Sequence, residues 1–339
     1  MINSYYSVIH VTNQPSFYKV KQWNEIAKHK KVLLIFMREI EKDRNKDFVS
    51  EKPYFDHITL PQNRFVSFWM LFWIILESHY SELILGGWYC LHLLLLPFIS
   101  KKKKNSFLCE SSIYEYRSSK FRDFIKRLFL HRISKVYVSG IAQKKIFDYL
   151  GYDGMVVFTG GCGLLNYIPQ PPYSPRGKVR NFLYVGRLVE QKNLKLLINV
   201  FNSRPDLNLQ IIGFGEQEQE LKTMAKPNIC FLGAVDNSKL SSYYQSADVF
   251  VLPSKIEPWG LVVEEALNNG TPVIVSDKVG CHDDLVSFET GLVFESVDEN
   301  GLYEAIEKML DVSYYNSLRK SISKLNFLER GKRQIDIFI

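Results

Sequence analysis

Two cationic side chains and two carboxylates follow apolar, β-branched runs in the second half of the sequence. Arg187 and Lys192 stand in YVGRLVEQKN, after a predicted strand that ends at Gly186. Glu257 and Glu265 stand in EPWGLVVEEAL, after the predicted strand DVFVL, which is the third predicted strand after the one that precedes Arg187. Ligands of open α/β sheets bind outside the carboxyl ends of the strands, where cations offset the charge of a diphosphate. Carboxylates there accept hydrogen bonds from hydroxyls, so the four side chains suit a ligand that carries both groups.

A helix is predicted to begin near Gly260 and to run to Asn269. The free amides of Gly260 and Leu261 at its positive terminus form a phosphate site, and the glycine lets a ligand approach the backbone closely. Glu257 then lies in the loop before the helix and Glu265 lies on it, so both can face one cleft.

Each feature also has a structural interpretation. An Arg and a Lys after a strand are commonly solvated loop residues. Carboxylates around a helix start are commonly explained by helix-terminus electrostatics and a solvated face, as for Glu264, which points about 100° away from Glu265 on an ideal helix. The two motifs together favour a binding site.

Apolar runs alternate with longer helical patterns along the whole chain, which predicts βαβ units and parallel sheets. The predicted strands of the first half are YSVIHV, VLLIFM, LILGG, SFLCE, KVYVSG and MVVFTGG, and those of the second are NFLYVG, LNLQIIG, NICFLG, DVFVLPS and TPVIVSD. We therefore expect an α/β protein of two doubly wound, Rossmann-like domains facing across a cleft.

A proline-rich connection sets the expected boundaries. Residues 1–167 form an acceptor-binding domain, 168–178 a linker with an interdomain hinge, and 179–312 a donor-binding domain. Residues 313–339 form a tail that crosses back to the first domain. The cleft between the domains is the expected active site.

Charge is unevenly distributed over the 339 residues. Residues 1–170 carry 24 Lys and Arg against 14 Asp and Glu, and the remainder carries 19 against 22. A basic first half predicts an anionic partner, such as a phospholipid surface, a phosphorylated substrate or nucleic acid. Because no nucleic-acid-binding motif is recognisable, the membrane is the better partner.

Three segments bear on membrane contact. Residues 65–76 and 83–99 are strongly apolar, and the second stretch is shorter than the roughly 20 residues of a spanning helix, so buried structure is favoured over an anchor there. The second is interpreted as a buried strand, a glycine turn and a leucine-rich helix. Residues 120–135 form a basic amphipathic helix that either packs its apolar face on the sheet or adsorbs to anionic lipid.

The lack of paired cysteines, of a secretory pattern and of a D-x-D motif bears on the cellular compartment and on metal use. Five cysteines at wide spacings without C-x-x-C, and an opening without a secretory pattern, favour a reducing cytoplasm. No D-x-D is present and Asp283-Asp284 is a weak metal signal, so we expect protein cations, and no metal or other cofactor, to serve the diphosphate.

The ordered motifs of residues 180–295 resemble the retaining glycosyltransferases of the group 1 (family 4) type, which have the GT-B fold. The resemblance rests on VGRLVEQKN, IIGFGEQEQEL, FLGAV, SADVFVLPS, EPWGLVVEEAL and SDKVGCHDDLV before GLVF. It implies that Arg187 and Lys192 bind the donor diphosphate, that Glu257 contacts the transferred sugar, and that Glu265 holds the ribose hydroxyls. Gly213 and Gly215 belong to the same donor site, and Arg187, Lys192 and Glu257 are the implied catalytic residues.

The first half resembles one branch of this family more loosely, through NQPSFYKVKQWNEI, LILGGW and FLCESS. Glu110 follows an apolar strand at the cleft-facing end and is the acceptor-side candidate, with a purely structural carboxylate as the alternative. His10 and His131 lie within a strand and a helix, where structural roles are expected.

The resemblance implies transfer of a sugar from a nucleotide-sugar donor, with retention of configuration. The basic, apolar-rich first half suits a glycan or lipid-linked oligosaccharide acceptor at the inner face of a membrane, as in bacterial surface polysaccharide synthesis. Two alternatives are a non-catalytic membrane-associated binding protein and a nicotinamide-dependent oxidoreductase. The latter lacks G-x-G-x-x-G, because Glu218 and Asn166 replace the third glycines.

Overall fold

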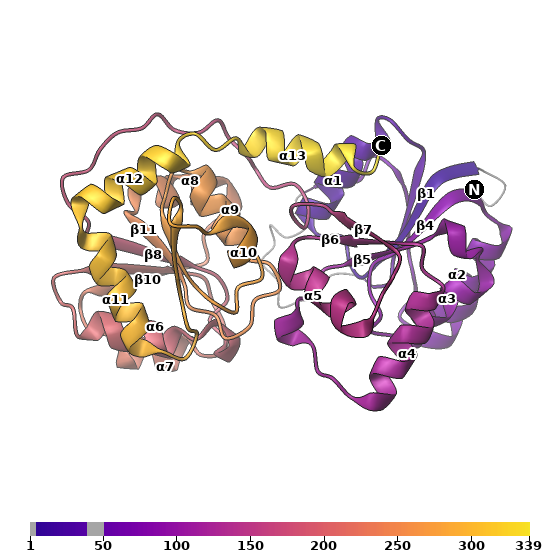
Figure 1. Ribbon diagram of the computed structural model, residues 1–339, viewed down its shortest axis with the longest axis horizontal. Helices are drawn as coiled ribbons and strands as arrows, with labels where there is room; N and C mark the ends of the chain where they lie inside the picture. Colours follow the sequence, from indigo (N-terminus) through magenta and orange to yellow (C-terminus); the bar gives the residue numbers. More distant parts are fainter. Residues whose placement is uncertain (1–4, 39–50) are drawn as a thin grey trace. The chain divides into compact units, whose positions relative to one another are not determined.

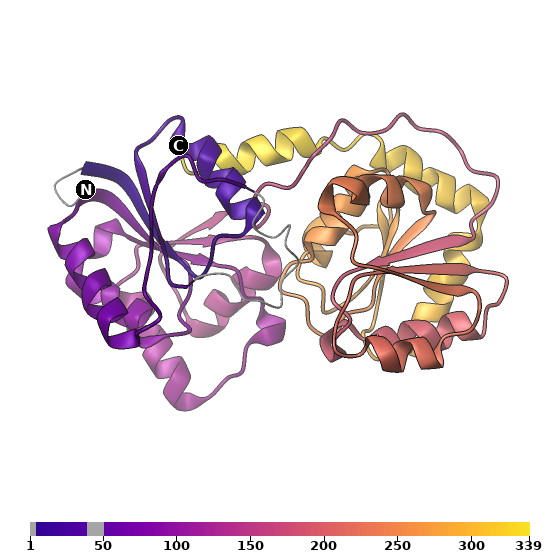
Figure 2. The same cartoon turned by 180° about the vertical axis from the view of Figure 1, so that it is seen from behind.

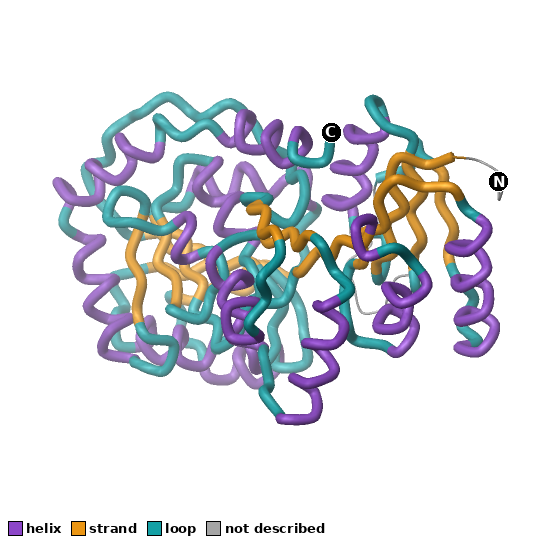
Figure 3. The backbone as a smooth tube through the Cα atoms, turned by 45° about the vertical axis from the view of Figure 1, so that its right-hand side comes forward, coloured by secondary structure: helices purple, strands orange, loops and turns teal. Residues whose placement is uncertain are grey.

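The computed structural model describes residues 5–38 and 51–339 and divides into two units. The first unit comprises residues 1–165 and 331–339, and the second comprises residues 166–330. Within the described ranges, each unit is a parallel sheet with helices on both faces, as Figures 1, 2 and 3 show. The prediction of two doubly wound α/β domains is confirmed.

The first sheet has the strand order β3-β2-β1-β4-β5-β6-β7. Its strands are β1 (Tyr5–Thr12), β2 (Val32–Phe36), β3 (Asp56–Thr59), β4 (His79–Leu85), β5 (Asn105–Cys109), β6 (Lys135–Val138) and β7 (Met155–Phe158). The helices are α1 (Phe17–Ala27), α2 (Arg64–Glu77), α3 (Leu91–Ile99), α4 (Lys120–His131) and α5 (Ile141–Leu150), with short 3₁₀ turns η2 (Lys102–Lys104) and η3 (Ile113–Glu115). The order reverses between β1 and β4, which defines the topological switch point of this domain.

The two faces of the first sheet have separate cores. One face packs against α2 to α5, and the other packs against α1 and the end of the chain. Phe338 reaches this second core, where its ring lies 5.4 Å from that of Trp23 and 4.7 Å from that of Tyr137. The residues that follow Arg330, within and beyond α13 (Phe327–Asp336), therefore complete the core of the first domain.

The second sheet has the order β10-β9-β8-β11-β12-β13. Its strands are β8 (Asn181–Val185), β9 (Asn208–Ile212), β10 (Ile229–Gly233), β11 (Val249–Leu252), β12 (Val273–Ser276) and β13 (Gly291–Phe294). Its helices are α6 (Leu194–Asn202), α7 (Glu218–Met224), α8 (Asn237–Ser246), α9 (Leu261–Asn268), α10 (His282–Leu285), α11 (Glu299–Leu310) and α12 (Val312–Ile322), with the turn η4 (Glu190–Lys192). Here the switch point lies between β8 and β11.

The proline-rich connection is fastened to the second domain. Ile168 and Asn268 exchange two hydrogen bonds of 3.1 and 2.8 Å between backbone and side-chain amide. The Arg176 guanidinium pairs with buried Asp248. These contacts give the connection a fixed course over the second domain.

The apolar segment at residues 65–76 forms most of α2, and its outer side is exposed. Phe65, Trp69 and Trp73 are 72%, 48% and 60% exposed. The sheet needs only one face of the helix, which Leu71 and Ile74 supply, so the remaining apolar side chains point away. The strand expected at Leu83 to Leu85 is buried as predicted.

The basic helix α4 packs only part of its apolar stripe on the sheet, which corrects the structural interpretation of residues 120–135 for the exposed part. Phe121, Phe124 and Leu128 are exposed, whereas Phe129 and Leu130 face the core. The helix is rotated so that Phe129 and Leu130, near its C-terminal end, meet the sheet, whereas most of the other apolar side chains point outward. No helix in the described part of the chain is long and apolar enough to cross a membrane.

Candidate functional site

The predicted cations follow β8, at the switch point of the second sheet. Gly186 directly follows the strand, and the Tyr184 hydroxyl donates to the Arg187 carbonyl at 2.9 Å, which shapes the turn. The Arg187 side chain is exposed and makes no ion pair within the described residues. Its guanidinium is therefore available to an anion at the carboxyl edge of the sheet.

Backbone packing explains why glycine is required at positions 213 and 215. A Cβ on Gly213, whose φ is +138°, would lie 1.8 Å from the Gly186 carbonyl oxygen, and one on Gly215 would lie 2.4 Å from that of Leu188. The loops after β8 and β9 touch here, and the Leu188 amide donates to the Phe214 carbonyl at 2.9 Å. The two glycines thus hold the Arg187 loop in place, and their contact with a donor stays a prediction.

Lys192 and Glu257 are brought together by the two strands that flank the switch point. Lys192 ends η4, Glu257 lies in the loop after β11, and their side chains form an ion pair in which each is 14% exposed. The Lys255 amide donates to the Gln191 carbonyl at 2.8 Å and joins the same two loops. The charge of Lys192 is consequently shared with Glu257 before any ligand arrives.

The loop before α9 is anchored on the loop after β12. The Glu257 amide donates to the Lys278 carbonyl at 3.1 Å, and the Gly280 amide donates to the Glu257 carbonyl at 2.9 Å. Gly260 has φ +102°, and a Cβ there would lie 2.9 Å from Val279. A side chain at this position would be strained and crowded, so the turn requires glycine.

The helix α9 begins at Leu261, as predicted, with Gly260 as its N-cap. Neither the Gly260 nor the Leu261 amide donates a hydrogen bond to another described residue. Free amides at the positive end of a helix bind anions, so the geometry keeps the predicted phosphate site open.

Glu265 lies on α9 apart from the Lys192–Glu257 pair and accepts a hydrogen bond of 2.8 Å from the Tyr244 hydroxyl. Burial raises the pKa of Glu265 to about 7, the Tyr244 hydrogen bond lowers it, and the Glu264 carboxylate raises it. Because the folded pKa exceeds the ordinary value of 4.5, the stability contributed by Glu265 is present below about pH 4.5 and is lost as pH rises through about 7.

This pKa predicts opposite effects of Glu265→Gln on stability and on binding. At about pH 8 the variant should melt at a higher temperature than the wild type, because no half-buried carboxylate has to ionise. The sequence resemblance implies that Glu265 holds ribose hydroxyls, for which an ionised carboxylate is the stronger acceptor, so the variant should also bind a nucleotide more weakly. Thermal denaturation at about pH 6 and pH 8, with and without UDP, measures both effects. Equal differences between the proteins at the two pH values would contradict the assignment.

Glu264, which sequence reasoning treated as solvated, is fully buried. It accepts hydrogen bonds from the Tyr167 hydroxyl at 2.6 Å and from the Trp259 indole, and the Arg330 guanidinium lies 4.0 Å away. Burial raises its pKa. The signal was the apolar run around it, VVEEAL, in which one of the two carboxylates must face the core.

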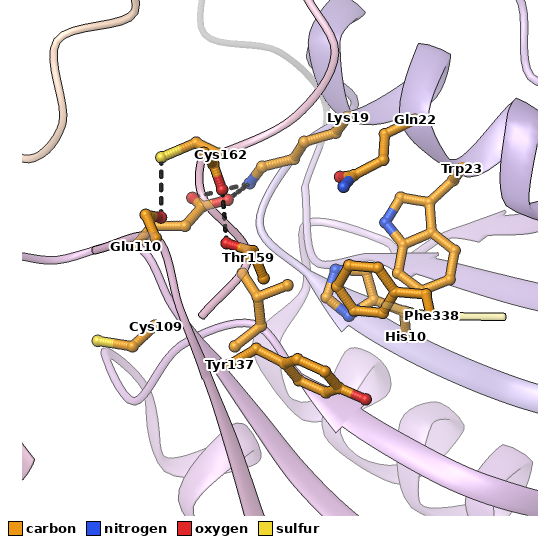
Figure 4. Close-up of a pocket in the computed structure, with 13 residues that line it drawn as sticks. His10, Lys19, Gln22, Trp23, Cys109, Glu110, Tyr137, Thr159, Cys162 and Phe338 are labelled. Carbon is orange, nitrogen blue, oxygen red and sulfur yellow. Dashed lines mark hydrogen bonds and ion pairs between the residues drawn. The ribbon is translucent and has the colours of Figure 1, made fainter. Parts of the chain in front are cut away.

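In the first domain, Glu110 is the partner of a buried lysine that sequence reasoning missed. The Lys19 ammonium lies 2.8 Å from a Glu110 carboxylate oxygen and also donates to Thr12 and Asn13 at 3.3 and 3.0 Å. Figure 4 shows Lys19 reaching from α1 toward the carboxylate. Lys19 stands four positions before buried Trp23, on the same side of α1. A lysine at this helical spacing from an apolar residue indicates that its side chain faces the core, and this pattern was visible in the sequence.

The predicted structural role of His10 fits its surroundings. His10 is buried, stacks on Trp23 at 5.0 Å and contacts the Ile84 carbonyl through Nδ1 at 3.2 Å. Burial lowers its pKa to about 3, and the charge of Lys19 contributes. His10 therefore stays neutral at physiological pH.

A cationic cavity of about 220 Å³ lies at the carboxyl edge of the first sheet. The Lys126 ammonium stands 4.3 Å from the Trp88 ring centre and 3.9 Å from that of Tyr116. Burial lowers the pKa of Lys126. The other charged residues of the lining are Arg117, Arg122 and Glu115. Three cations against one carboxylate make this cavity suited to an anion.

Residues 171–325 match the model of the family described as glycosyl transferases group 1. The O-antigen biosynthesis glycosyltransferase WbnH of Escherichia coli is 30% identical over 188 residues, which cover 55% of this chain and 52% of that protein. The phosphatidyl-myo-inositol mannosyltransferase of Mycobacterium leprae is 32% identical over 189 residues, which cover 52% of this chain and 50% of that protein. The chain thus spans about half the length of these two curated relatives.

Solved structures share the fold over nearly the whole chain. Anabaena HepE in complex with UDP has a TM-score of 0.73 at 14% identity, with 98% of this chain and 97% of that chain covered. At this identity the likeness concerns the fold alone, and it agrees with the two doubly wound sheets. Residues 171–325 contain Arg187, Lys192, Glu257 and Glu265, so all four lie in the part of the chain that is similar to the group 1 glycosyltransferases.

Proposed function

We propose that this protein transfers a hexosyl-type sugar from a nucleoside diphosphate sugar to a glycan or lipid-linked acceptor, with retention of the anomeric configuration. One observation carries the proposal. At the switch point of the second sheet, the exposed Arg187, the free amides of Gly260 and Leu261, and the Lys192–Glu257 pair follow neighbouring strands. Cations and free amides at one edge suit a diphosphate, and Glu257 suits a hydroxylated sugar.

The same groups have a catalytic use. When the bond between the sugar and the nucleotide breaks, negative charge accumulates on the leaving diphosphate. Arg187 and the α9 amides interact most strongly with that charged state, which is the condition for accelerating the step. Lys192 is shared between the diphosphate and Glu257, so donor binding loosens Glu257 toward the sugar. We propose that these protein groups serve the diphosphate without a divalent metal.

The first domain supports an anionic acceptor. The cavity around Lys126 presents three cations beside the aromatic rings of Trp88 and Tyr116, which suits a phosphate next to an apolar or sugar moiety. Glu110 stays the acceptor-side candidate, and its carboxylate also balances the charge of Lys19. A phosphate-bearing, lipid-linked oligosaccharide meets these requirements.

The cellular role follows from the acceptor. The name of WbnH places that protein in O-antigen biosynthesis, and the name of the Mycobacterium leprae relative gives it a lipid acceptor. Together with the basic first half, these names support a role in bacterial surface polysaccharide synthesis, on the cytoplasmic face of the membrane. Nucleic acid is not among the proposed partners.

Nucleotide-induced stabilisation tests the donor site. A ligand at about one hundred times its Kd adds about 2.7 kcal/mol to the stability of the native state, which is expected to raise the melting temperature by about 5 °C or more. We expect this shift with UDP or GDP, also in EDTA, and none with CMP or NAD. Stabilisation by NAD alone would favour the oxidoreductase, and a lack of any shift would favour the non-catalytic binding protein.

A further inference from the structure

The outer face of α2 carries a row of exposed apolar side chains. Phe65, Trp69, Trp73 and Leu76 are 72%, 48%, 60% and 54% exposed and follow each other at intervals of four, four and three residues. No charged residue stands between Arg64 and Glu77. Since the inner side of α2 is already packed on the sheet, this helix is apolar all round and its outer face needs an apolar environment.

The apolar face continues over the two neighbouring helices. Helices α2 and α3 are in contact, as are α3 and α4, and Figure 1 shows the three side by side. Leu91 and Phe98 of α3 are 63% and 50% exposed, and Phe121 and Phe124 of α4 are 73% and 58% exposed. We call these four residues, with the four of α2, the aromatic face.

Cations surround the aromatic face. Lys101, Lys102 and Lys103 follow α3 and are exposed, Arg64 begins α2, and Arg122 lies beside Phe121. Residues 64–131 carry ten Lys and Arg against five Asp and Glu. Two of those five carboxylates are engaged with lysines inside the domain, as the Glu82–Lys135 and Glu110–Lys19 pairs show. The rim is therefore strongly cationic.

This charge pattern favours one partner for the aromatic face over another. A second copy of the chain, docked about a two-fold axis through this face, would bring like cations together and pair few of them with carboxylates. An anionic bilayer offers an apolar interior and negative headgroups at the same time. Exposed Trp side chains have an apolar ring and a polar N–H, which suits the boundary between the two.

We propose that the aromatic face inserts into the boundary between headgroups and acyl chains of an anionic phospholipid bilayer, with α2 lying in the membrane plane. This inference deepens the membrane association proposed above, which rests on charge alone. Adsorption by charge disappears at high salt, whereas insertion of aromatic side chains buries apolar area and resists salt.

Intrinsic fluorescence reports this insertion directly. Of the five tryptophans, Trp23 and Trp259 are buried and Trp88 is half-buried, so Trp69 and Trp73 dominate the response to solvent. With vesicles of phosphatidylcholine containing about one third phosphatidylglycerol, we expect a blue shift of the emission and quenching by lipids brominated on the acyl chains. Both should persist in 1 M NaCl, where the Debye length is about 3 Å.

Matched variants separate insertion from adsorption. Trp69→Gln with Trp73→Gln should weaken co-sedimentation with these vesicles at least about tenfold at high salt, because two large apolar side chains are lost. Phe288→Gln removes an even more exposed aromatic, 85% accessible, from the second domain and should change nothing. Replacing Lys101, Lys102 and Lys103 by Gln should weaken binding at low salt only.

Three results would overturn the proposal. One is the absence of a blue shift, and another is vesicle binding that vanishes at high salt. The third is a wild-type dimer that the double Trp variant dissolves, which would make a second copy the occupant. All variants should keep the wild-type melting temperature and its UDP-induced shift, so a failure here is distinguishable from a failure of the proposed donor site.

Discussion

Replacing Arg187 by alanine should lower the turnover number about 10²-fold while leaving the melting temperature of the free protein unchanged. The loss in catalysis is expected because, in the reaction proposed above, the guanidinium stabilises the charge that develops on the leaving diphosphate, and removal of one such donor costs about 3 kcal/mol. Stability should not change because the side chain is exposed and pairs with no described residue. Initial rates at saturating donor and a thermal melt measure the two quantities.

Lys320→Ala is the matched control for Arg187→Ala, because it removes an exposed cation of the same domain far along the chain on α12. It should leave both turnover and melting temperature as in the wild type. If Arg187→Ala raised KM for the donor but left turnover intact, Arg187 would bind ground state and transition state equally, and its catalytic assignment would be wrong.

The second large effect concerns stability. Glu264→Ala should lower the free energy of unfolding of the second domain by about 3 kcal/mol, because it leaves the Tyr167 hydroxyl and the Trp259 indole without their acceptor in a buried site. The loop before α9 should loosen as well, since Trp259 lies next to Gly260. Urea denaturation followed by circular dichroism gives the change.

Glu264→Gln separates the hydrogen bonds from the volume of the side chain. The amide oxygen still accepts one hydrogen bond and fills the same space, so the loss should be smaller than for alanine. Equal stability of Glu264→Ala and the wild type would show that the two donors find other partners. That result would remove the structural role assigned to this carboxylate.

The sequence predicted best the parts of the site that local chemistry determines. Arg187, Lys192 and Glu257 follow apolar strands, and parallel strands bring their carboxyl ends to one edge, so the edge could be predicted without coordinates. The start of α9 at Leu261 followed from Gly260 in the same way.

What the sequence did not predict depends on how the elements rotate and pair. Lys19 and Glu110 are 91 positions apart, and no pattern along the chain joins them. The phase of α4, which exposes Phe121, is set by the way Phe129 meets the sheet. The carboxylate of Glu264 faces inward because the Tyr167 hydroxyl and the Trp259 indole donate hydrogen bonds to it there. Tyr167 is 97 positions away in the chain, and Trp259 lies in the loop before α9.

Because Phe338 packs in the core of the first domain, that domain cannot finish folding until the last residues of the sequence have been synthesised. Gln22 and Gly163 donate hydrogen bonds to Gln334, so the side of the sheet that carries α1 depends on residues after 330. At about 5–20 residues per second, the ribosome adds these residues roughly 10–35 s after Leu165. During that interval Trp23 and Tyr137 lack the ring that covers them, while the whole second domain is made. The domain that is synthesised first is therefore the one that is finished last.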